Sequence, residues 1–173
     1  MHKYVDMNIH SSKKVQQPKA NSQQPELKYC YKYPHPAVTA DCVIFGFDES
    51  DNMKVLLIQR GNDPYKGKWA FPGGFMNMDE TAEQCARREL EEETGLKDVA
   101  VEQFYTFTDV NRDPRERVIT VAHYALVKLS EVKANDDADD AQWFSLDEIP
   151  PLAFDHEEIL NKALQTLKEN KKL

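Results

Sequence analysis

The stretch from Thr81 to Thr94 constrains the fold more than any other part of the sequence. It contains neither glycine nor proline, is rich in strong helix formers, and is followed by Gly95, a residue suited to the C-terminal cap of a helix. Thr81 and Gln84 have the spacing of a capping box, in which the side chain of each bonds to the backbone N–H of the other. The stretch therefore predicts a helix with a defined beginning and end.

Three glutamates of this predicted helix share one face. At about 100° per residue, Glu92 lies about 60° to one side of Glu89, and Glu93 about 40° to the other. The N-terminal half of the same stripe carries small residues, namely Ala82, Cys85 and Ala86. Such a stripe indicates a face packed against the protein, where the carboxylates would repel one another. Divalent cations would remove this repulsion, and oxygen ligands favour Mg²⁺ or Mn²⁺ over zinc.

The acidic run also has a plainer interpretation. Arginines and glutamates at helical spacing from Arg87 to Glu93 are typical of a solvated surface helix. The Gly73-Gly74 pair ahead of the helix favours metal binding, because it could bring a backbone carbonyl close to the same ion.

The remaining predicted elements are strands and one further helix. The strands are expected at Ala37–Phe47, Lys54–Arg60, Val99–Thr108, Arg117–Leu129 and Ala141–Phe144. An amphipathic helix is expected from about His156 to Lys168. Strands mixed with two well-separated helices predict an α/β or α+β sandwich, with helices on both faces of a mixed sheet.

Charge and composition limit the partners and the location. The chain has 22 Lys and Arg against 30 Asp and Glu, a net charge of -8 that would repel a nucleic-acid backbone or an anionic membrane. We therefore expect neither a nucleic-acid polymer nor a membrane as partner, whereas a small phosphorylated substrate is compatible if metal ions bridge it to the carboxylates. Three cysteines without CxxC spacing, and no apolar signal segment, predict a cytoplasmic protein. A homodimer is left open.

The first 28 residues differ in composition from the rest. From His10 to Lys28 the chain is rich in Gln, Ser, Lys and Pro, with only isolated apolar residues. Such a segment buries too little surface to offset its ordering entropy. We expect a disordered leader over residues 1–28 and one folded domain over residues 29–173.

A spaced motif spans the predicted helix and the loop before it. It reads Gly74, five residues, Glu80, seven residues, Arg88-Glu89-Leu90, one residue, Glu92-Glu93, one residue, Gly95-Leu96. This is the complete Nudix box, and the chain resembles the Nudix family. The resemblance implies an α/β/α sandwich with a loop-helix-loop catalytic motif, and hydrolysis of a nucleoside diphosphate linked to another moiety. It also implies that Glu89, Glu92, Glu93 and the carbonyl of Gly73 bind Mg²⁺, while Glu80 and Arg88 hold the loop against the helix.

Segments outside the box resemble the ADP-ribose pyrophosphatase branch of the family. They are GKWAFPGGF, the loop from Arg112 to Arg115, Asp136-Asp137-Ala138 ahead of Trp143-Phe144, and LAFDH at Leu152–His156. This branch implies that ADP-ribose is hydrolysed to AMP and ribose 5-phosphate. The related regulators of NAD metabolism add a winged-helix domain, for which we expect no room after His156. The alternatives are hydrolysis of 8-oxo-dGTP or another nucleoside triphosphate, and a module that senses a NAD-related metabolite without turnover.

Arginines and acidic residues supply the remaining candidates. Arg112, Arg115 and Arg117 lie between two predicted strands and could reach substrate phosphates, although an ordinary charged hairpin loop fits them as well. We assign Arg60, Arg112 and Arg115 to substrate binding. The general base that takes the proton of the attacking water could be Glu93, Asp136 or Asp137.

Four further side chains are assigned to the core. Trp69 and Phe71 could stack on a base, but core packing is the expected role. Cys85 is expected to be a small core residue rather than a nucleophile, and His123 a core histidine within a strand.

Overall fold

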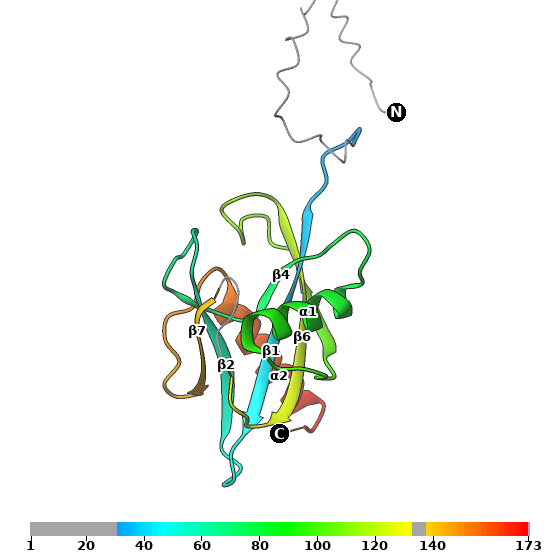
Figure 1. Cartoon of the computed structure of the whole chain (residues 1–173). Helices are drawn as coiled ribbons and strands as arrows, with labels where there is room; N and C mark the ends of the chain where they lie inside the picture. The colour runs from blue at the N-terminus through cyan, green and yellow to red at the C-terminus, as the bar shows by residue number, and fades with distance from the viewer. Residues whose placement is uncertain (1–30, 133–137, 173) are drawn as a thin grey trace, which may run out of the picture. The chain divides into compact units, whose positions relative to one another are not determined.

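The computed structural model describes residues 31–132 and 138–172 (Figure 1). The predicted leader over residues 1–28 and the candidate bases Asp136 and Asp137 lie outside these residues. Residues 34–173 form one compact unit. Within the described ranges, no helix has both the length and the apolar character needed to cross a membrane.

A mixed sheet forms the centre of this unit. Its strands are β1 (Ala37–Phe47), β2 (Met53–Arg60), β3 (Trp69–Ala70), β4 (Gly73–Phe75), β5 (Glu102–Phe107), β6 (Val118–Lys128) and β7 (Ala138–Ser145). The main path runs β3-β2-β1-β6-β5, while β4 pairs with β1 and β7 with β2. The pair of β1 and β6 is parallel, and the other pairs are antiparallel. The predicted mixed sheet is confirmed.

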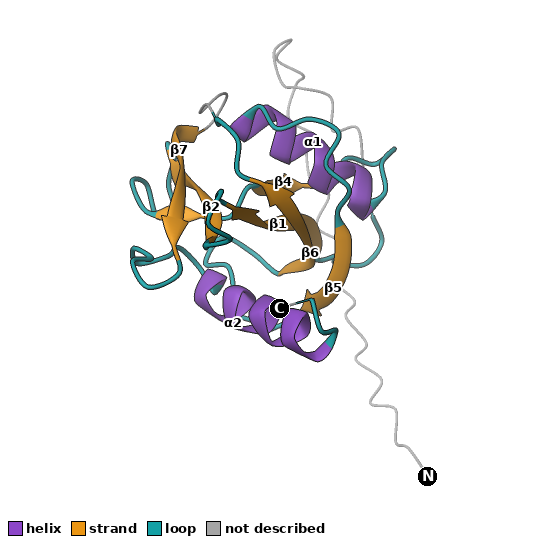
Figure 2. Ribbon diagram, turned by 90° about the horizontal axis from the view of Figure 1, so that it is seen from below, coloured by secondary structure: helices purple, strands orange, loops and turns teal. Residues whose placement is uncertain are grey.

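Two helices cover opposite faces of the sheet (Figure 2). They are α1 (Ala82–Thr94) and α2 (His156–Glu169). Because successive side chains of a strand point to opposite faces, β1 serves both layers. Cys42 and Ile44 pack with the residues of α1, whereas Val43 and Phe45 pack with those of α2. The predicted sandwich is therefore confirmed.

The ends of α1 follow the local sequence signals. Thr81 Oγ1 accepts from the Gln84 N–H at 3.2 Å, and Gln84 Oε1 accepts from the Thr81 N–H at 2.8 Å, which completes the capping box. Gly95 has a φ of 75° and donates its N–H to Glu91 O at 2.9 Å. Both predicted caps are present, so the orientation of the glutamates around the helix axis is set locally.

The short strands β3 and β4 are not foreseen by the sequence pattern. Each is too short to show a period, and each depends on a partner strand elsewhere in the chain. Strand β4 pairs with the first half of β1, placing Gly73 opposite Asp41, while the end of β1 pairs with β2. The predicted strand Val99–Thr108 is shortened to Glu102–Phe107, and Ala141–Phe144 is lengthened to Ala138–Ser145.

Candidate active site

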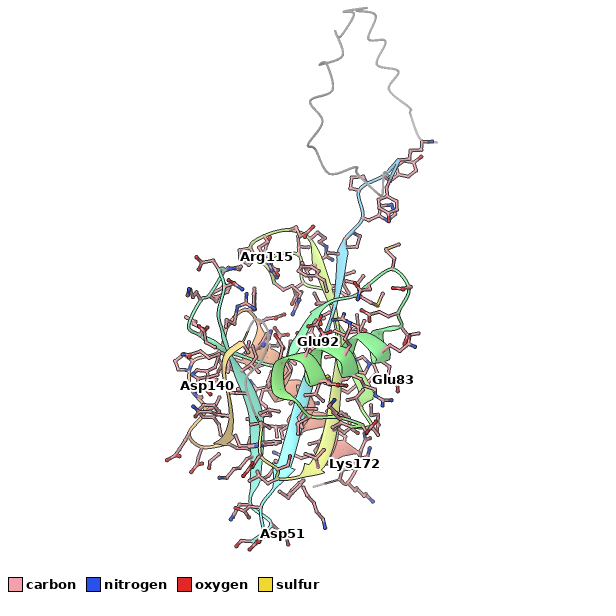
Figure 3. The ribbon with its side chains drawn as sticks, in the orientation of Figure 1. Asp51, Glu83, Glu92, Arg115, Asp140 and Lys172 are labelled. Atoms are coloured by element: carbon pink, nitrogen blue, oxygen red, sulfur yellow. The ribbon has the colours of Figure 1, made fainter. Side chains whose placement is uncertain are left out.

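A cavity of about 400 Å³ lies where the sheet, α1 and the start of α2 meet. Its lining combines the inner face of α1, the glycines of β4, the end of β2 and the loop before β6. Figure 3 labels Glu92 on α1 and Arg115 on that loop. The volume falls within the roughly 300–1,000 Å³ of small-molecule sites.

Glu93 is the buried glutamate of this cavity. It is 8% exposed, and its Oε2 accepts the Gly73 N–H at 2.9 Å. Burial, followed by the charges of Glu89 and Asp41, raises the pKa of Glu93 to about 8. Burial also raises the pKa of Glu89. The inward face predicted for the three glutamates is confirmed for Glu89 and Glu93 but is wrong for Glu92, whose side chain is exposed. The charges of Glu89 and Glu93 are unfavourable without a cation.

Arg88 braces the loop that precedes α1. Its Nε and Nη2 donate to the two carboxylate oxygens of Glu80 at 3.0 and 2.6 Å, and Nη2 also donates to Phe75 O at 3.2 Å. Hydrogen bonds from Arg88 are the main cause that lowers the pKa of Glu80 to about 2. The role that the resemblance implied for Glu80 and Arg88 agrees with these contacts.

Gly74 leaves room for the carboxylate of Glu89. A Cβ at this position would overlap the carboxylate of Glu89. The absence of a side chain therefore lets Glu89 lie directly against the backbone of β4, next to the residue whose N–H holds Glu93. Any larger residue would force the carboxylate to move.

The structure separates Glu92 from the other two glutamates. Its side chain is 43% exposed, does not line the cavity, and accepts from Arg88 Nη1 at 2.9 Å. In residues 31–132 and 138–172, no three His, Cys, Asp or Glu side chains stand together as a ready-made metal site. Mg²⁺, however, is usually held by one or two protein carboxylates together with substrate phosphates and water. The donor set of Glu89 and Glu93 fits that cation.

The three arginines assigned to substrate binding all line the cavity but differ in their partners. Arg112 donates to both oxygens of Asp155 at 2.8 and 2.7 Å, and Arg115 pairs with Asp113 at 2.7 Å. Arg60 instead donates to the backbone carbonyls of Pro64 and Asn62 at 2.9 and 3.4 Å. Among the described residues, no carboxylate lies within ion-pair distance of Arg60, so its charge is available to an anion.

Arg117 lies outside the cavity lining. Its guanidinium donates to the carbonyls of Thr108 and Asp109 at 2.7 and 2.9 Å, which closes the loop between β5 and β6. For this residue the geometry matches the plainer interpretation of a charged loop.

Several residues of the cavity were not singled out individually from the sequence. Asp41 is buried and accepts from Thr120 Oγ1 at 2.6 Å, and His156 Nδ1 accepts the Phe71 N–H at 2.9 Å. Phe154 lines the cavity beside them. His156 and Phe154 belong to the LAFDH segment, whose resemblance to the ADP-ribose branch was their only signal; Asp41 had none, because it lies within an ordinary strand pattern.

The side chains assigned to the core are found there. Phe71 is fully buried, and Trp69 packs against the same cluster. Cys85 lies on the buried face of α1, and burial raises the pKa of its thiol to about 12, which argues against a nucleophile. His123 is buried, and its Nδ1 lies 3.0 Å from Val121 O. These four predictions are confirmed.

The buried Glu93 and the partly buried Glu89 share the cavity with the guanidinium of Arg60, which has no carboxylate partner among the described residues. Such a combination is typical of a site for a divalent cation and a phosphorylated ligand. Residues 35–165 match the model of the NUDIX domain. The chain belongs to the Nudix family of hydrolases, as the box indicated.

Individual relatives are similar over most of the chain. The ADP-ribose pyrophosphatase of Methanocaldococcus jannaschii is 44% identical over 140 residues, which cover 81% of this chain and 80% of that protein. The ADPR responsive transcriptional repressor NtrR of Acinetobacter baylyi is 36% identical over 78% of this chain and 56% of its own length. The NUDIX domain of Shewanella oneidensis NrtR, solved with ADP ribose, superimposes with a TM-score of 0.74 at 34% identity, covering 81% of this chain and 94% of that one.

Proposed function

We propose that this protein hydrolyses the diphosphate linkage of ADP-ribose, giving AMP and ribose 5-phosphate, and that the reaction depends on Mg²⁺. The proposal rests on the presence of Glu89, Glu93 and the guanidinium of Arg60 in the lining of one cavity. The carboxylates can hold a metal cation, and the guanidinium can bind a phosphate. Positive charge is needed because a diphosphate and the carboxylates are both negatively charged and repel one another. The relatives named for ADP-ribose support the choice of substrate.

The metal ligands of this proposal are Glu89, Glu92, Glu93 and the carbonyl of Gly73, with Mn²⁺ as a substitute for Mg²⁺. Glu92 would first exchange its bond to Arg88 for the ion. When bound, the ion neutralises charge that develops on the phosphates and lowers the pKa of a coordinated water.

The residues of the chain orient the reactants and move one proton. Arg60 and Arg115 bind the phosphate oxygens, while Arg112 holds the loop that carries Arg115. Water forms a new P–O bond at one phosphorus as the bridging P–O bond breaks, and the proton released by water passes to a base. Among the described residues, Glu93 is the candidate for that base, because its carboxylate lines the cavity and is held in place by the Gly73 N–H. Asp136 and Asp137 stay alternatives.

A second candidate function is the sensing of ADP-ribose without turnover. The similarity to the ADPR responsive repressor favours it, although the matched region covers only 56% of that protein. Under this alternative the cavity would bind the same ligand, and the glutamates would not be needed for a reaction. The expectations of a cytoplasmic location and of no nucleic-acid partner stay predictions.

One panel of substrates separates these functions. The purified chain is incubated with ADP-ribose, other nucleoside diphosphate sugars, dinucleotides and 8-oxo-dGTP, each with Mg²⁺ or with EDTA, and the products are separated by chromatography. We expect AMP and ribose 5-phosphate from ADP-ribose, with Mg²⁺ only. Calorimetric binding of ADP-ribose without products would support sensing, and a tenfold preference for 8-oxo-dGTP in kcat/KM would contradict the assignment to ADP-ribose.

A further inference from the structure

Two arginines and two aromatic rings alternate along one wall of the cavity. The guanidinium carbon of Arg60 lies 4.9 Å from the ring centre of Phe154, and that of Arg115 lies 5.6 Å from the same ring. Arg115 is also 5.1 Å from the ring centre of Phe75. We call Arg60, Phe154, Arg115 and Phe75 the cation–ring row. All four line the cavity, and they come from four different segments of the chain.

Phe154 adopts a backbone conformation that is unfavourable for its residue type. Its φ is 51°, in the left-handed region that an aromatic residue rarely occupies. Neighbouring contacts impose this conformation. The N–H of Ala153 donates to Trp69 O at 2.8 Å, and Asp155 holds Arg112 with both carboxylate oxygens. Strain of this kind persists only where the surroundings over-determine it, and it concentrates at functional sites.

The ring of Phe154 is also held from the side. Tyr65 meets it edge-on, with ring centres 4.8 Å apart and an angle of 66° between the planes. The ring of His156 lies 5.6 Å away. Phe154 therefore has little freedom to turn, and the two guanidiniums that contact it are kept at a defined separation.

Holding two cations beside one ring is unfavourable unless an anion is present. Arg115 has a counter-charge in Asp113, but Arg60 has only backbone carbonyls among the described residues. Two linked phosphates carry more anionic oxygens over a longer span than a single phosphate, so they are better suited to engage both guanidiniums at once. The arrangement thus discriminates by the number and spacing of the anionic groups.

We propose that Phe154 is a positioning residue that spaces the guanidiniums of Arg60 and Arg115, so that the cavity binds a diphosphate in preference to a single phosphate. The inference rests on the cavity of the proposed function, and it requires only that the ligand contain a diphosphate. It does not depend on the nucleoside or on turnover.

The test compares two simple probes on the full chain. Methylenediphosphonate, a diphosphate mimic that cannot be hydrolysed, and inorganic phosphate are titrated by calorimetry in the presence of Mg²⁺. We expect the wild-type protein to bind the diphosphonate at least tenfold more tightly than phosphate. Phe154→Leu should reduce that ratio below threefold, whereas Phe154→Tyr, which keeps the ring, should stay within twofold of the wild-type ratio.

Two further variants exclude a purely structural role. Phe154→Asn also removes the ring, but asparagine tolerates a positive φ, so it serves if the leucine variant does not fold. Tyr105→Leu is the matched control, because Tyr105 also faces a cation, Lys162 at 5.3 Å, but lies outside the cavity lining. It should leave the ratio unchanged. An unchanged ratio in both ring-less variants, equal weakening of both probes, or no diphosphonate preference in the wild type would overturn the inference.

Failure of the proposed function gives a different result. If ADP-ribose is neither bound nor hydrolysed while the ratio still depends on Phe154, the proposed substrate is wrong and the role of Phe154 stands. If ADP-ribose is hydrolysed and the ratio of diphosphonate to phosphate affinity does not change in the Phe154 variants, the proposed function stands and the role of Phe154 is wrong.

Discussion

Arg112 and Asp155 form a two-point ion pair across 43 positions of sequence, with distances of 2.8 and 2.7 Å. Asp155 is the residue that precedes α2, and its side chain makes no capping bond to the helix. The Asp155 carboxylate therefore binds the loop before β6 and does not cap α2. Arg112 also approaches Asp41 on β1 at 3.8 Å, so one guanidinium ties a loop, a strand and a helix together.

We predict that Arg112→Ala acts on stability before it acts on substrate binding. The guanidinium is only 4% exposed, and its removal leaves Asp155 and Asp41 without their cation. Breaking a buried pair from one side costs about 3–5 kcal/mol. Urea unfolding should show a loss of this order. Lys97→Ala, which removes an exposed pair with Glu91, is the control and should leave the midpoint nearly unchanged. An Arg112→Ala protein as stable as wild type would contradict the buried role.

Arg60→Ala should raise KM for ADP-ribose and leave kcat nearly unchanged. Arg60 has no carboxylate partner among the described residues, so its loss removes binding to the substrate without breaking an ion pair of the protein. We expect a rise in KM of about tenfold, which corresponds to about 1.4 kcal/mol of uniform binding. Arg117→Ala, which changes an arginine outside the cavity lining, should behave as wild type. Equal KM values for the two variants would show that Arg60 does not contact substrate.

Glu93→Gln should remove most of the activity while the fold is kept. The amide oxygen can still accept the N–H of Gly73, and the substitution removes the ionised form, which burial and the charge of Glu89 disfavour. Without metal, the melting temperature should therefore hold or rise. Single-turnover kinetics with Mg²⁺ provide the test. Retention of more than about a tenth of the wild-type kcat, a loss below about 1.4 kcal/mol, would rule out the metal-ligand role.

As the pH drops below the ordinary pKa of histidine, His156 should destabilise the folded protein, while Glu93, whose raised pKa favours proton uptake in the folded state, should act in the opposite direction. Burial lowers the pKa of His156 in the folded protein, so near pH 6 the unfolded chain takes up a proton that the folded protein does not. This favours unfolding progressively from about pH 6.5 downward, by up to about 1.4 kcal/mol per pH unit.

The corresponding variant is His156→Asn. Its side-chain oxygen can still accept the Phe71 N–H that His156 Nδ1 now accepts at 2.9 Å, but it does not titrate. On acidification from pH 7.5 to 5.5, the free energy of unfolding should fall less, or rise more, in the variant than in the wild type. An equal slope in the two proteins would show that His156 does not carry the effect.

Features with local causes were predictable from the sequence. The ends of α1 depend on Thr81, Gln84 and Gly95, which act on backbone groups within one turn, and both caps were found as expected. Helical periodicity placed Glu89 and Glu93 correctly on the inward face, but it also placed Glu92 there, at the edge of the stripe, where the structure leaves it exposed. The strand Ala37–Phe47 was predicted with its observed bounds, because its apolar and β-branched run is long enough to be distinctive.

The sequence by itself therefore determined the family, the sandwich, and the helix face that carries the inward glutamates. Only the tertiary structure decided how the arginines are paired. Arg112 binds Asp155 and Arg115 binds Asp113, whereas Arg60 has no carboxylate partner in the part of the chain that the structure describes. The tertiary structure also leaves the Glu92 side chain exposed, and it places the ring of Phe154 next to both Arg60 and Arg115. Periodicity describes how a side chain points within its own element, whereas pairing depends on which distant segments the sheet register and helix packing bring together.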